Sequence, residues 1–235
     1  MNELEGVVDR FVVIEARQDH QLNPKQLLFA KRREEFLRWP IEHMIVDRID
    51  EDGHIEHGAA FAQRKAISRY AATLPDDDLI LISDADEIPA RWAVEMIKDA
   101  PGDAWAFHQR LFYYCANWES DEGWWGTRAY RKSVLPENPR VWRAMGALLA
   151  NEAPIERAGW HLSWWGGAEG IREKLRAFSD KQWNCPEMTD GDYIERCLSI
   201  KRTIHAQRPL KKVPVDHSFP RHLYWFPERY REYID

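Results

Sequence analysis

The chain has 235 residues, a formal net charge of −6 and 31% charged residues. This length suits one large α/β domain, and no apolar run in the sequence approaches the length of a membrane span. The negative charge argues against nucleic acid as a partner, because that binding depends on clustered Lys and Arg. Three cysteines at unrelated spacings predict neither a disulfide framework nor a zinc site. We therefore expect a single domain over residues 1–235 in a reducing compartment.

Apolar, β-prone runs alternate with segments of helical period along the chain. The first half predicts strands at 11–16 and 41–46, helices at 25–39 and 58–74, and a strand that begins at Leu79. The second half predicts strands in WAFHQRLFYY and GTRAYRKSV, and helices in AEGIREKLRAF and DYIERCLSI. This alternation is typical of a layered α/β fold.

Three carboxylates follow an apolar strand in LILISDADEIPARW, residues 79–92. We expect Pro89 to begin the next helix, which puts Asp84, Asp86 and Glu87 in a turn at the carboxyl end of the strand. Like charges this close repel one another and raise one another's pKa. The acidic turn therefore predicts a bound cation.

The acidic turn has three interpretations. In the first, Asp84 and Asp86 hold Mg²⁺ or Mn²⁺, and the ion carries the diphosphate of a sugar nucleotide. In the second, Asp84 is the nucleophile and Asp86 the general acid of a DxD phosphohydrolase, whose other motifs the chain matches only in part. In the third, the carboxylates cap the following helix, since a helix N-terminus favours negative charge. A lone DxD leaves all three open.

Tryptophan is unusually frequent, with 12 residues against nine Phe and eight Tyr. Two pairs, Trp124 with Trp125 and Trp164 with Trp165, lie in polar, glycine-containing segments. Their flat rings suit the apolar faces of sugars, and the indole N–H can donate to a hydroxyl. We predict that both pairs bind a glycan acceptor. The alternative for each ring is ordinary core packing.

Four segments resemble a known family in their order and spacing: GVVDRFVVIEA, ISDADEIPAR, AGWHLSWWGGAEGIREKL and HSFPRHLYWFPERYREYI. The chain is similar to the glycosyltransferase family of the β-1,4-mannosyl-glycoprotein β-1,4-N-acetylglucosaminyltransferase, the enzyme that adds bisecting GlcNAc to N-glycans. The resemblance implies a GT-A-type nucleotide-diphosphosugar transferase fold, layered α/β/α with a mixed sheet. It also implies UDP-GlcNAc as donor, dependence on Mn²⁺ or Mg²⁺, and inversion at the anomeric carbon.

The sequence departs from this family in three respects. Members usually carry an additional strand ahead of the segment that begins at Asn2, and we expect this chain to lack it. The aromatic and acidic residues that precede the Gln-Arg pair in the family are replaced by HGAAF, while Gln63 and Arg64 remain. We expect no Golgi-type membrane anchor, and hence a cytoplasmic enzyme of bacterial or viral type that acts on an envelope or capsule glycan precursor.

The resemblance also implies roles for single residues. Asp86 is the predicted metal ligand, while Asp84 reaches the ribose or a metal-bound water. His161 in AGWHLSW is a candidate nitrogen ligand, which suits Mn²⁺, and His217 is its competitor. The structural alternative for His161 is a packed, hydrogen-bonded histidine.

Two further residues are predicted to contact the sugar nucleotide, Glu15 at the end of the first strand and Arg64 on the helix before the DxD strand. An inverting transferase also needs a base for the acceptor hydroxyl. Glu169 is the predicted base, because Trp-Gly-Gly followed by an acid is similar to the acceptor segment of β-1,4-galactosyltransferases. The alternatives are Asp121, Glu122 and Asp192.

A non-catalytic sugar-binding protein on the same fold is the alternative from another class of function. Such a protein could keep the Trp pairs without needing the acidic turn. The sequence retains all three carboxylates of that turn, and this favours the enzyme.

Overall fold

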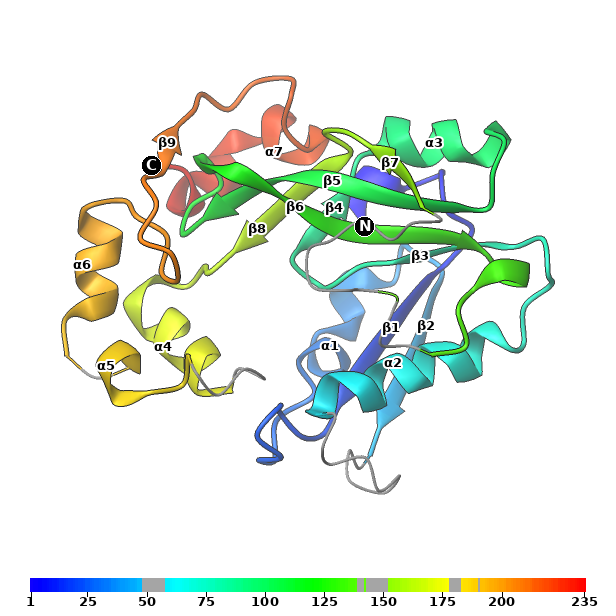
Figure 1. Ribbon diagram of the computed structural model, residues 1–235, viewed down its shortest axis with the longest axis horizontal. Coiled ribbons are helices and arrows are strands. Elements are labelled where there is room, and N and C mark those ends of the chain that lie inside the picture. Colours follow the sequence, from blue (N-terminus) through cyan, green and yellow to red (C-terminus); the bar gives the residue numbers. More distant parts are fainter. Residues whose placement is uncertain (48–57, 139–141, 143–151, 178–182, 190) are drawn as a thin grey trace.

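Two β-sheets form the frame of the molecule, and helices pack around them (Figure 1). The structure is a computed structural model that describes residues 1–47, 58–138, 142, 152–177, 183–189 and 191–235. Strands and helices are interspersed along the chain. The mixed α/β class that the sequence predicts is confirmed.

The smaller sheet consists of two parallel strands, β1 (Phe11–Ala16) and β2 (Ile41–Val46). Helix α2 (Gly58–Ala71) packs on it through Ala62 and Ala66, which lie one helical turn apart. Small side chains at this spacing let the helix approach the sheet closely. The two strands and the helix predicted for this region are confirmed.

The predicted helix over 25–39 is wrong in its length. The structure has a single α-helical turn, α1 (Leu28–Lys31), followed by the 3₁₀ helix η2 (Arg33–Phe36). Arg32 between them has φ −110° and ψ 13°, outside the α-helical region. Its guanidinium binds Glu35 at 2.7 Å. That i,i+3 pair suits a 3₁₀ helix, where side chains three apart eclipse.

The larger sheet contains seven strands. They are β3 (Leu79–Ile82), β4 (Glu87–Pro89), β5 (Ala104–Tyr113), β6 (Trp118–Arg131), β7 (Ala153–Ile155), β8 (Gly159–Ser163) and β9 (Lys211–Lys212). The path runs β3-β6-β5-β8-β4, with β7 paired to β5 and β9 to β6. Strand β5 is parallel to β7 and β8, and the other pairs are antiparallel. The sheet is therefore mixed, whereas the layered GT-A arrangement stays a prediction.

The main core lies on the side of the sheet that carries α3 (Arg91–Asp99) and α7 (Arg221–Trp225). Ile97 of α3 and Leu223 of α7 are buried there with Phe107 of β5. Short 3₁₀ helices complete this region and the loops nearby: η1 (Asn2–Leu4), η4 (Lys132–Val134) and η6 (Pro227–Tyr233).

A second core lies at one end of the larger sheet, where α4 (Gly167–Ala177), α5 (Pro186–Thr189) and α6 (Tyr193–Ser199) gather (Figure 1). Ile171 and Leu175, one turn apart on α4, are fully buried against this end of the sheet. The predicted helices in AEGIREKLRAF and DYIERCLSI are confirmed.

Pro89 does not begin a helix, in contrast to the prediction. It ends β4, which pairs with β8 in the register Glu87↔His161 and Pro89↔Gly159. A proline is tolerated there because β4 is the last strand on its side of the sheet path. Helix α3 begins two residues later, at Arg91. The acidic turn thus leads into a short strand, and this strand fixes its position.

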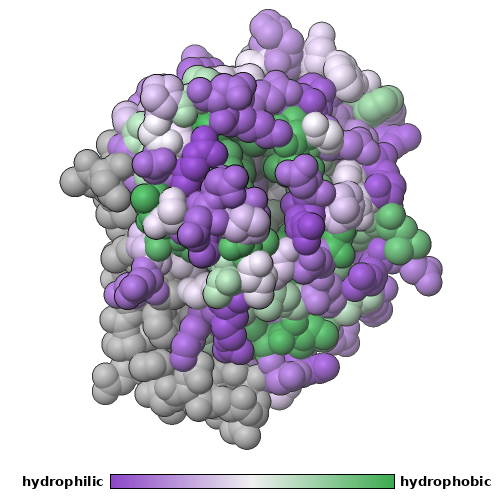
Figure 2. Space-filling view, turned by 90° about the vertical axis from the view of Figure 1, so that its right-hand side faces the viewer, coloured by the Kyte–Doolittle hydropathy of each residue, from purple (hydrophilic) through white to green (hydrophobic). Residues whose placement is uncertain are grey.

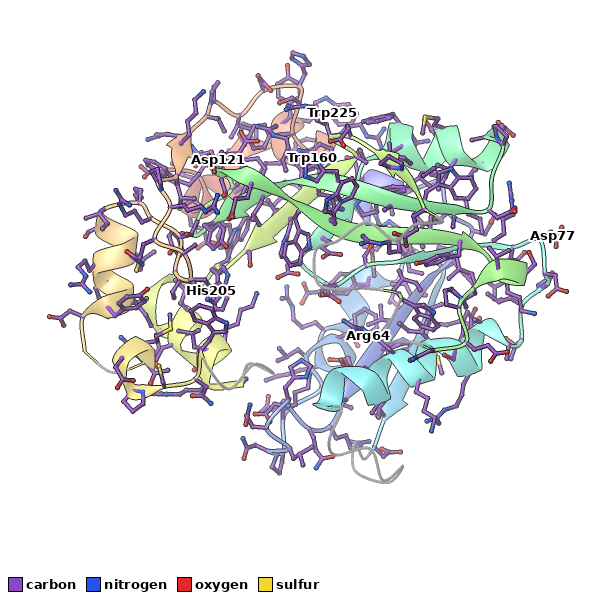
Figure 3. All side chains as sticks on the ribbon, in the orientation of Figure 1. Arg64, Asp77, Asp121, Trp160, His205 and Trp225 are labelled. Carbon is purple, nitrogen blue, oxygen red and sulfur yellow. The ribbon has the colours of Figure 1, made fainter. Side chains whose placement is uncertain are left out.

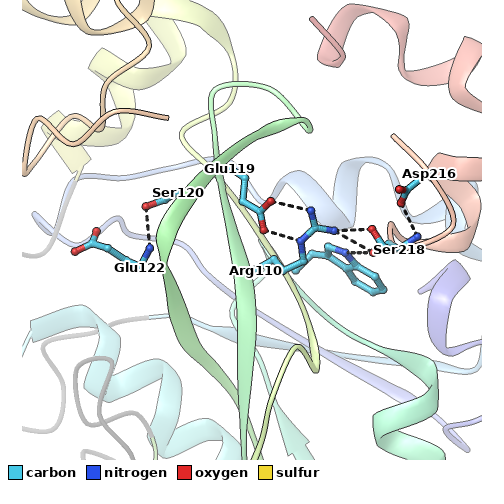
Figure 4. Close-up of polar contacts among 7 residues, drawn as sticks. Arg110, Glu119, Ser120, Glu122, Asp216 and Ser218 are labelled. Carbon is cyan, nitrogen blue, oxygen red and sulfur yellow. Dashed lines mark hydrogen bonds and ion pairs between the residues drawn. The ribbon is translucent and has the colours of Figure 1, made fainter. Parts of the chain in front are cut away.

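Arg110 of β5 joins the β5–β6 hairpin to the C-terminal segment (Figure 4). Its guanidinium binds the Glu119 carboxylate through two contacts, 2.7 and 2.9 Å long, and donates to Ser218 Oγ at 2.9 Å. Bidentate charge-assisted pairs of this kind are among the stronger hydrogen bonds. The hairpin that carries Trp124 and Trp125 is therefore anchored near its turn.

Hydrophilic side chains cover most of the face seen in Figure 2, with small groups of hydrophobic residues between them. Among the helices in the described ranges, none combines the length and the apolar character needed to cross a bilayer.

We predict that Gly159→Ala destabilises the protein by about 1–3 kcal/mol more than a change at an uncrowded glycine. A Cβ at Gly159 would lie 2.2 Å from the Ile88 carbonyl oxygen, so β8 must move away from β4. Gly6→Ala is the matched control: Gly6 also has a positive φ, of 74°, but nothing lies within 4 Å of its Cβ position. Urea unfolding measures both variants, and equal losses would show that the close approach is unimportant.

Candidate active site

Glu87 is buried and holds the acidic turn in place through hydrogen bonds. It is only 5% exposed, and its two carboxylate oxygens accept hydrogen bonds from the Asp84 backbone N–H (3.1 Å) and the Trp124 indole N–H (2.7 Å). The Glu87 N–H in turn donates to the Asp84 carbonyl. With its oxygens used in this way, Glu87 fixes the turn, while Asp84 stays exposed and Asp86 partly exposed.

The pairing of β4 with β8 brings Asp86 to His161. The Asp86 carbonyl accepts the Leu162 N–H at 2.9 Å, and Asp86 Oδ2 lies 3.4 Å from His161 Nε2. The His161 ring packs against that of Trp124, with centroids 5.0 Å apart, and its Nδ1 is buried without a hydrogen-bond partner. The two residues predicted as metal ligands thus lie together, although they are 75 positions apart in the chain.

Lys174 of α4 is a third member of this cluster and was not predicted from the sequence. Its Nζ lies 2.9 Å from Asp86 Oδ2 and 4.9 Å from the centroid of the Trp164 ring. The only local signal is its place beside the buried face of α4 that Ile171 and Leu175 form. Its pairing with Asp86 depends on tertiary structure alone.

The surroundings of Asp86 favour its charged form. Burial by itself would raise the pKa of Asp86, but the contact with His161 and the positive charge of Lys174 outweigh it. The pKa of Asp86 is therefore held well below its usual range. The carboxylate is available as an anionic oxygen ligand at any physiological pH.

Asp86 and His161 offer one carboxylate oxygen and one imidazole nitrogen, a mixed donor set that a divalent metal ion can take. Among the described residues, no three His, Cys, Asp or Glu side chains gather as a complete metal site would require. Ions that act on nucleotides usually take only one or two protein ligands, with water and phosphate oxygens as the rest. Asp86 and His161 therefore fit an ion whose other ligands are water and the oxygens of a bound diphosphate. His217 is exposed, and the carboxylate that interacts with it is that of the adjacent Asp216.

Glu15 lies on β1 of the smaller sheet, and Arg64 lies on α2, which packs on that sheet. The Glu15 oxygens accept the N–H groups of Phe29 (2.9 Å) and Ala30 (3.0 Å), and Glu15 Oε2 contacts His43 Nε2 at 3.0 Å. Glu15 therefore holds α1 against β1. Arg64 lies on α2 and is partly buried (Figure 3). Their contacts with a sugar nucleotide stay predictions.

The two tryptophan pairs differ in their surroundings. Trp124 and Trp125, in β6, line a pocket of about 460 Å³. Trp164 is only 4% exposed and belongs to the core under α4, and Trp165 stacks on Tyr233 with centroids 4.8 Å apart. In the second pair, ordinary packing accounts for these contacts, and a role in acceptor binding stays a prediction.

Glu169, the predicted base, lies on the outer surface of α4. Its side chain is 67% exposed and bound to Arg172 at 2.7 Å, and Arg172 also binds Glu195. Glu169 and Lys174 are five positions apart on α4. Their side chains therefore point in directions about 140° apart around the helix axis. Among the alternatives, Glu122 lines the pocket with Trp124, whereas Asp121 lines a smaller pocket of about 220 Å³.

Comparisons with known proteins show the family of this chain. A family model described as Glycosyltransferase family 17 matches residues 1–204, and the chain belongs to that family. The family is one of glycosyltransferases.

The chain is also a distant homologue of named enzymes. It is 29% identical, over 229 residues, to the β-1,4-mannosyl-glycoprotein 4-β-N-acetylglucosaminyltransferases of Homo sapiens, Rattus norvegicus and Mus musculus. The matches cover 83% of this chain but 42% of each relative, so the chain spans less than half the length of these curated proteins. No solved structure matches the chain significantly.

We predict that Lys174→Met lowers the free energy of unfolding by about 1 kcal/mol at neutral pH, since a partly exposed ion pair is lost. The lowered pKa of Asp86 means that the pair stabilises the fold above the unfolded-state pKa, near 3.9. This contribution is lost as the pH falls from there through the lower folded-state pKa. The difference between parent and variant should therefore be constant down to about pH 5 and shrink below pH 4.

Lys132→Met is the control, because Lys132 pairs with the exposed Asp76, which precedes β3, whereas the acidic turn follows it. Urea titrations at several pH values measure both variants. A Lys174→Met effect no larger than that of Lys132→Met, or one that persists unchanged at pH 3, would contradict the role given to the Asp86 pair.

Proposed function

We propose that this chain transfers N-acetylglucosamine from UDP-N-acetylglucosamine to a hydroxyl of a glycan acceptor, with inversion at the anomeric carbon and with Mn²⁺ or Mg²⁺. Membership of glycosyltransferase family 17 supports the reaction class. The names of the homologous enzymes support the sugar and a mannosyl acceptor. The observation that carries the proposal is the 3.4 Å approach of His161 Nε2 to Asp86 Oδ2 on the acidic turn.

This pair would hold the metal on the donor side of the site. A bound divalent ion would offset the charge of the diphosphate and stabilise UDP as the leaving group. His161 Nδ1 is buried without a hydrogen-bond partner, so Nε2, which faces Asp86, is the ring nitrogen that an ion could reach. Glu87 and Trp124 keep the turn in one geometry, which is what a preorganised site requires.

Lys174 contributes positive charge at the same place. In the unliganded protein its ammonium neutralises Asp86, at 2.9 Å. With a donor bound, the same ammonium would donate a hydrogen bond to a diphosphate oxygen, a usual role for lysine at phosphates. Asp84 lies exposed at the turn. In this proposal its carboxylate would bind the ribose of the donor.

The phosphohydrolase remains the competing chemistry for a DxD turn, with Asp84 as its nucleophile. Family membership favours glycosyl transfer over phosphate hydrolysis. The two reactions also make opposite demands on the turn. Transfer needs Asp86 most, whereas hydrolysis of a phosphomonoester needs Asp84 most.

We predict that Asp86→Asn lowers glycosyl transfer at least ~100-fold, because one directed electrostatic stabiliser of the transition state is lost. The variant should fold, since its side chain keeps the size of the parent's. Asp77→Asn is the control: Asp77 is exposed on a distant turn (Figure 3), and its activity should equal the parent's.

Transfer of labelled GlcNAc and release of phosphate from a phosphomonoester are measured on the parent, Asp84→Asn and Asp86→Asn. Full metal-dependent transfer by Asp86→Asn would refute the proposed metal site. Phosphate release that vanishes in Asp84→Asn would instead establish the phosphohydrolase.

A further inference from the structure

The pocket beside Trp124 has the size and lining of a sugar-binding site. Its volume of about 460 Å³ lies in the range of small-molecule sites. Trp124 and Trp125 of β6, Tyr113 of β5 and His205 supply aromatic surface, and Glu122 supplies a carboxylate. We refer to it as the tryptophan pocket.

We propose that the tryptophan pocket binds the acceptor sugar and that Glu122 is the base that takes the proton of its attacking hydroxyl. This inference rests on the proposed function. In the reaction, the acceptor O–H bond breaks and its oxygen bonds to the anomeric carbon of the donor. The bond from that carbon to the diphosphate breaks with its electron pair on UDP, and the proton goes to the Glu122 carboxylate.

Trp124 connects this pocket to the acidic turn. Its indole N–H donates to Glu87 at 2.7 Å, and its ring packs on His161, which contacts Asp86. The same side chain lines the tryptophan pocket. A sugar in the pocket therefore lies next to the donor side of the site, as transfer between two bound molecules requires.

The chemistry of the pocket suits a pyranose ring. Indole and phenol rings pack against the apolar C–H faces of a sugar, and polar groups at their edges bind its hydroxyls. Burial, together with the negative charge of Glu122, raises the pKa of Tyr113 to about 12. The Tyr113 hydroxyl therefore stays protonated at neutral pH and can donate a hydrogen bond to the sugar.

Glu122 is the one carboxylate among the described residues that line the tryptophan pocket. Its side chain is 35% exposed and is held by Arg208 Nη2 at 3.1 Å. In the hairpin, Glu122 points to the opposite side of β6 from Glu119, which is bound to Arg110 (Figure 4). Glu122 thus faces the pocket and is accessible to a ligand, two requirements for a general base.

The adjacent Asp121 offers a matched comparison. It lies one residue away on the same strand, so its side chain points to the other face of the sheet, where it lines the smaller pocket. Its place at the end of the hairpin is seen in Figure 3. Removing its charge changes the net charge of the protein as much as removing that of Glu122, but leaves the tryptophan pocket intact.

The first test compares Glu122→Gln with Asp121→Asn. Glu122→Gln should lower kcat for transfer ~10²–10⁴-fold, the usual contribution of a general base. It should leave unchanged the thermal stabilisation that UDP gives with Mn²⁺, because the donor side is untouched. Asp121→Asn should behave as the parent in both measurements. Transfer retained by Glu122→Gln, while the parent is active, would refute the base and leave the proposed function standing.

The second test uses sugar binding and does not depend on transfer. Saturation-transfer NMR with millimolar methyl β-mannoside should show contact with the parent, and the signal should be lost in Trp125→Ala. Trp92→Ala is the control, since Trp92 is exposed on α3, outside the pocket. No signal with the parent, or an equal signal in Trp125→Ala, would overturn the acceptor pocket whether or not the enzyme is active.

Discussion

The pairing of β4 with β8 is the contact on which the candidate site depends. It puts Glu87 opposite His161 and lets the Asp86 carbonyl accept the Leu162 N–H, so the acidic turn is held by a sheet and not by its own residues alone. Gly159 makes this approach possible, because any Cβ there would meet the Ile88 carbonyl. The position of the acidic turn therefore depends on the close backbone contact between β4 and β8 at Gly159.

The candidate site has two parts, a charged cluster and an aromatic pocket. Asp86, His161 and Lys174 form a charged cluster around one carboxylate oxygen, which suits a metal-bound diphosphate. The aromatic pocket beside it suits a sugar ring. Trp124 belongs to both parts, since its N–H binds Glu87 while its ring lines the pocket. A glycosyltransferase needs this arrangement, with a donor and an acceptor bound next to each other.

Local sequence patterns predicted most of the strands and helices but less of the site. The apolar runs at 11–16 and 41–46 form strands as predicted, and the two strands pair in parallel with each other. The single helix predicted over 25–39 is broken at Arg32, whose φ and ψ lie outside the α-helical region. The contact of Lys174 with Asp86 joins residues 88 positions apart, and no local pattern encodes it. Trp164 lies in a glycine-rich segment that looks exposed, yet helices that follow it in the chain bury it.

The central claim is that the acidic turn binds a diphosphate through a metal. The most direct measurement is the melting temperature with UDP-GlcNAc, with and without Mn²⁺, because a ligand that binds only the folded state raises its stability. We expect stabilisation only when the metal is present, since Lys174 offsets the charge of Asp86 alone and leaves the diphosphate and Asp84 to repel each other. Equal stabilisation in excess chelator would contradict it.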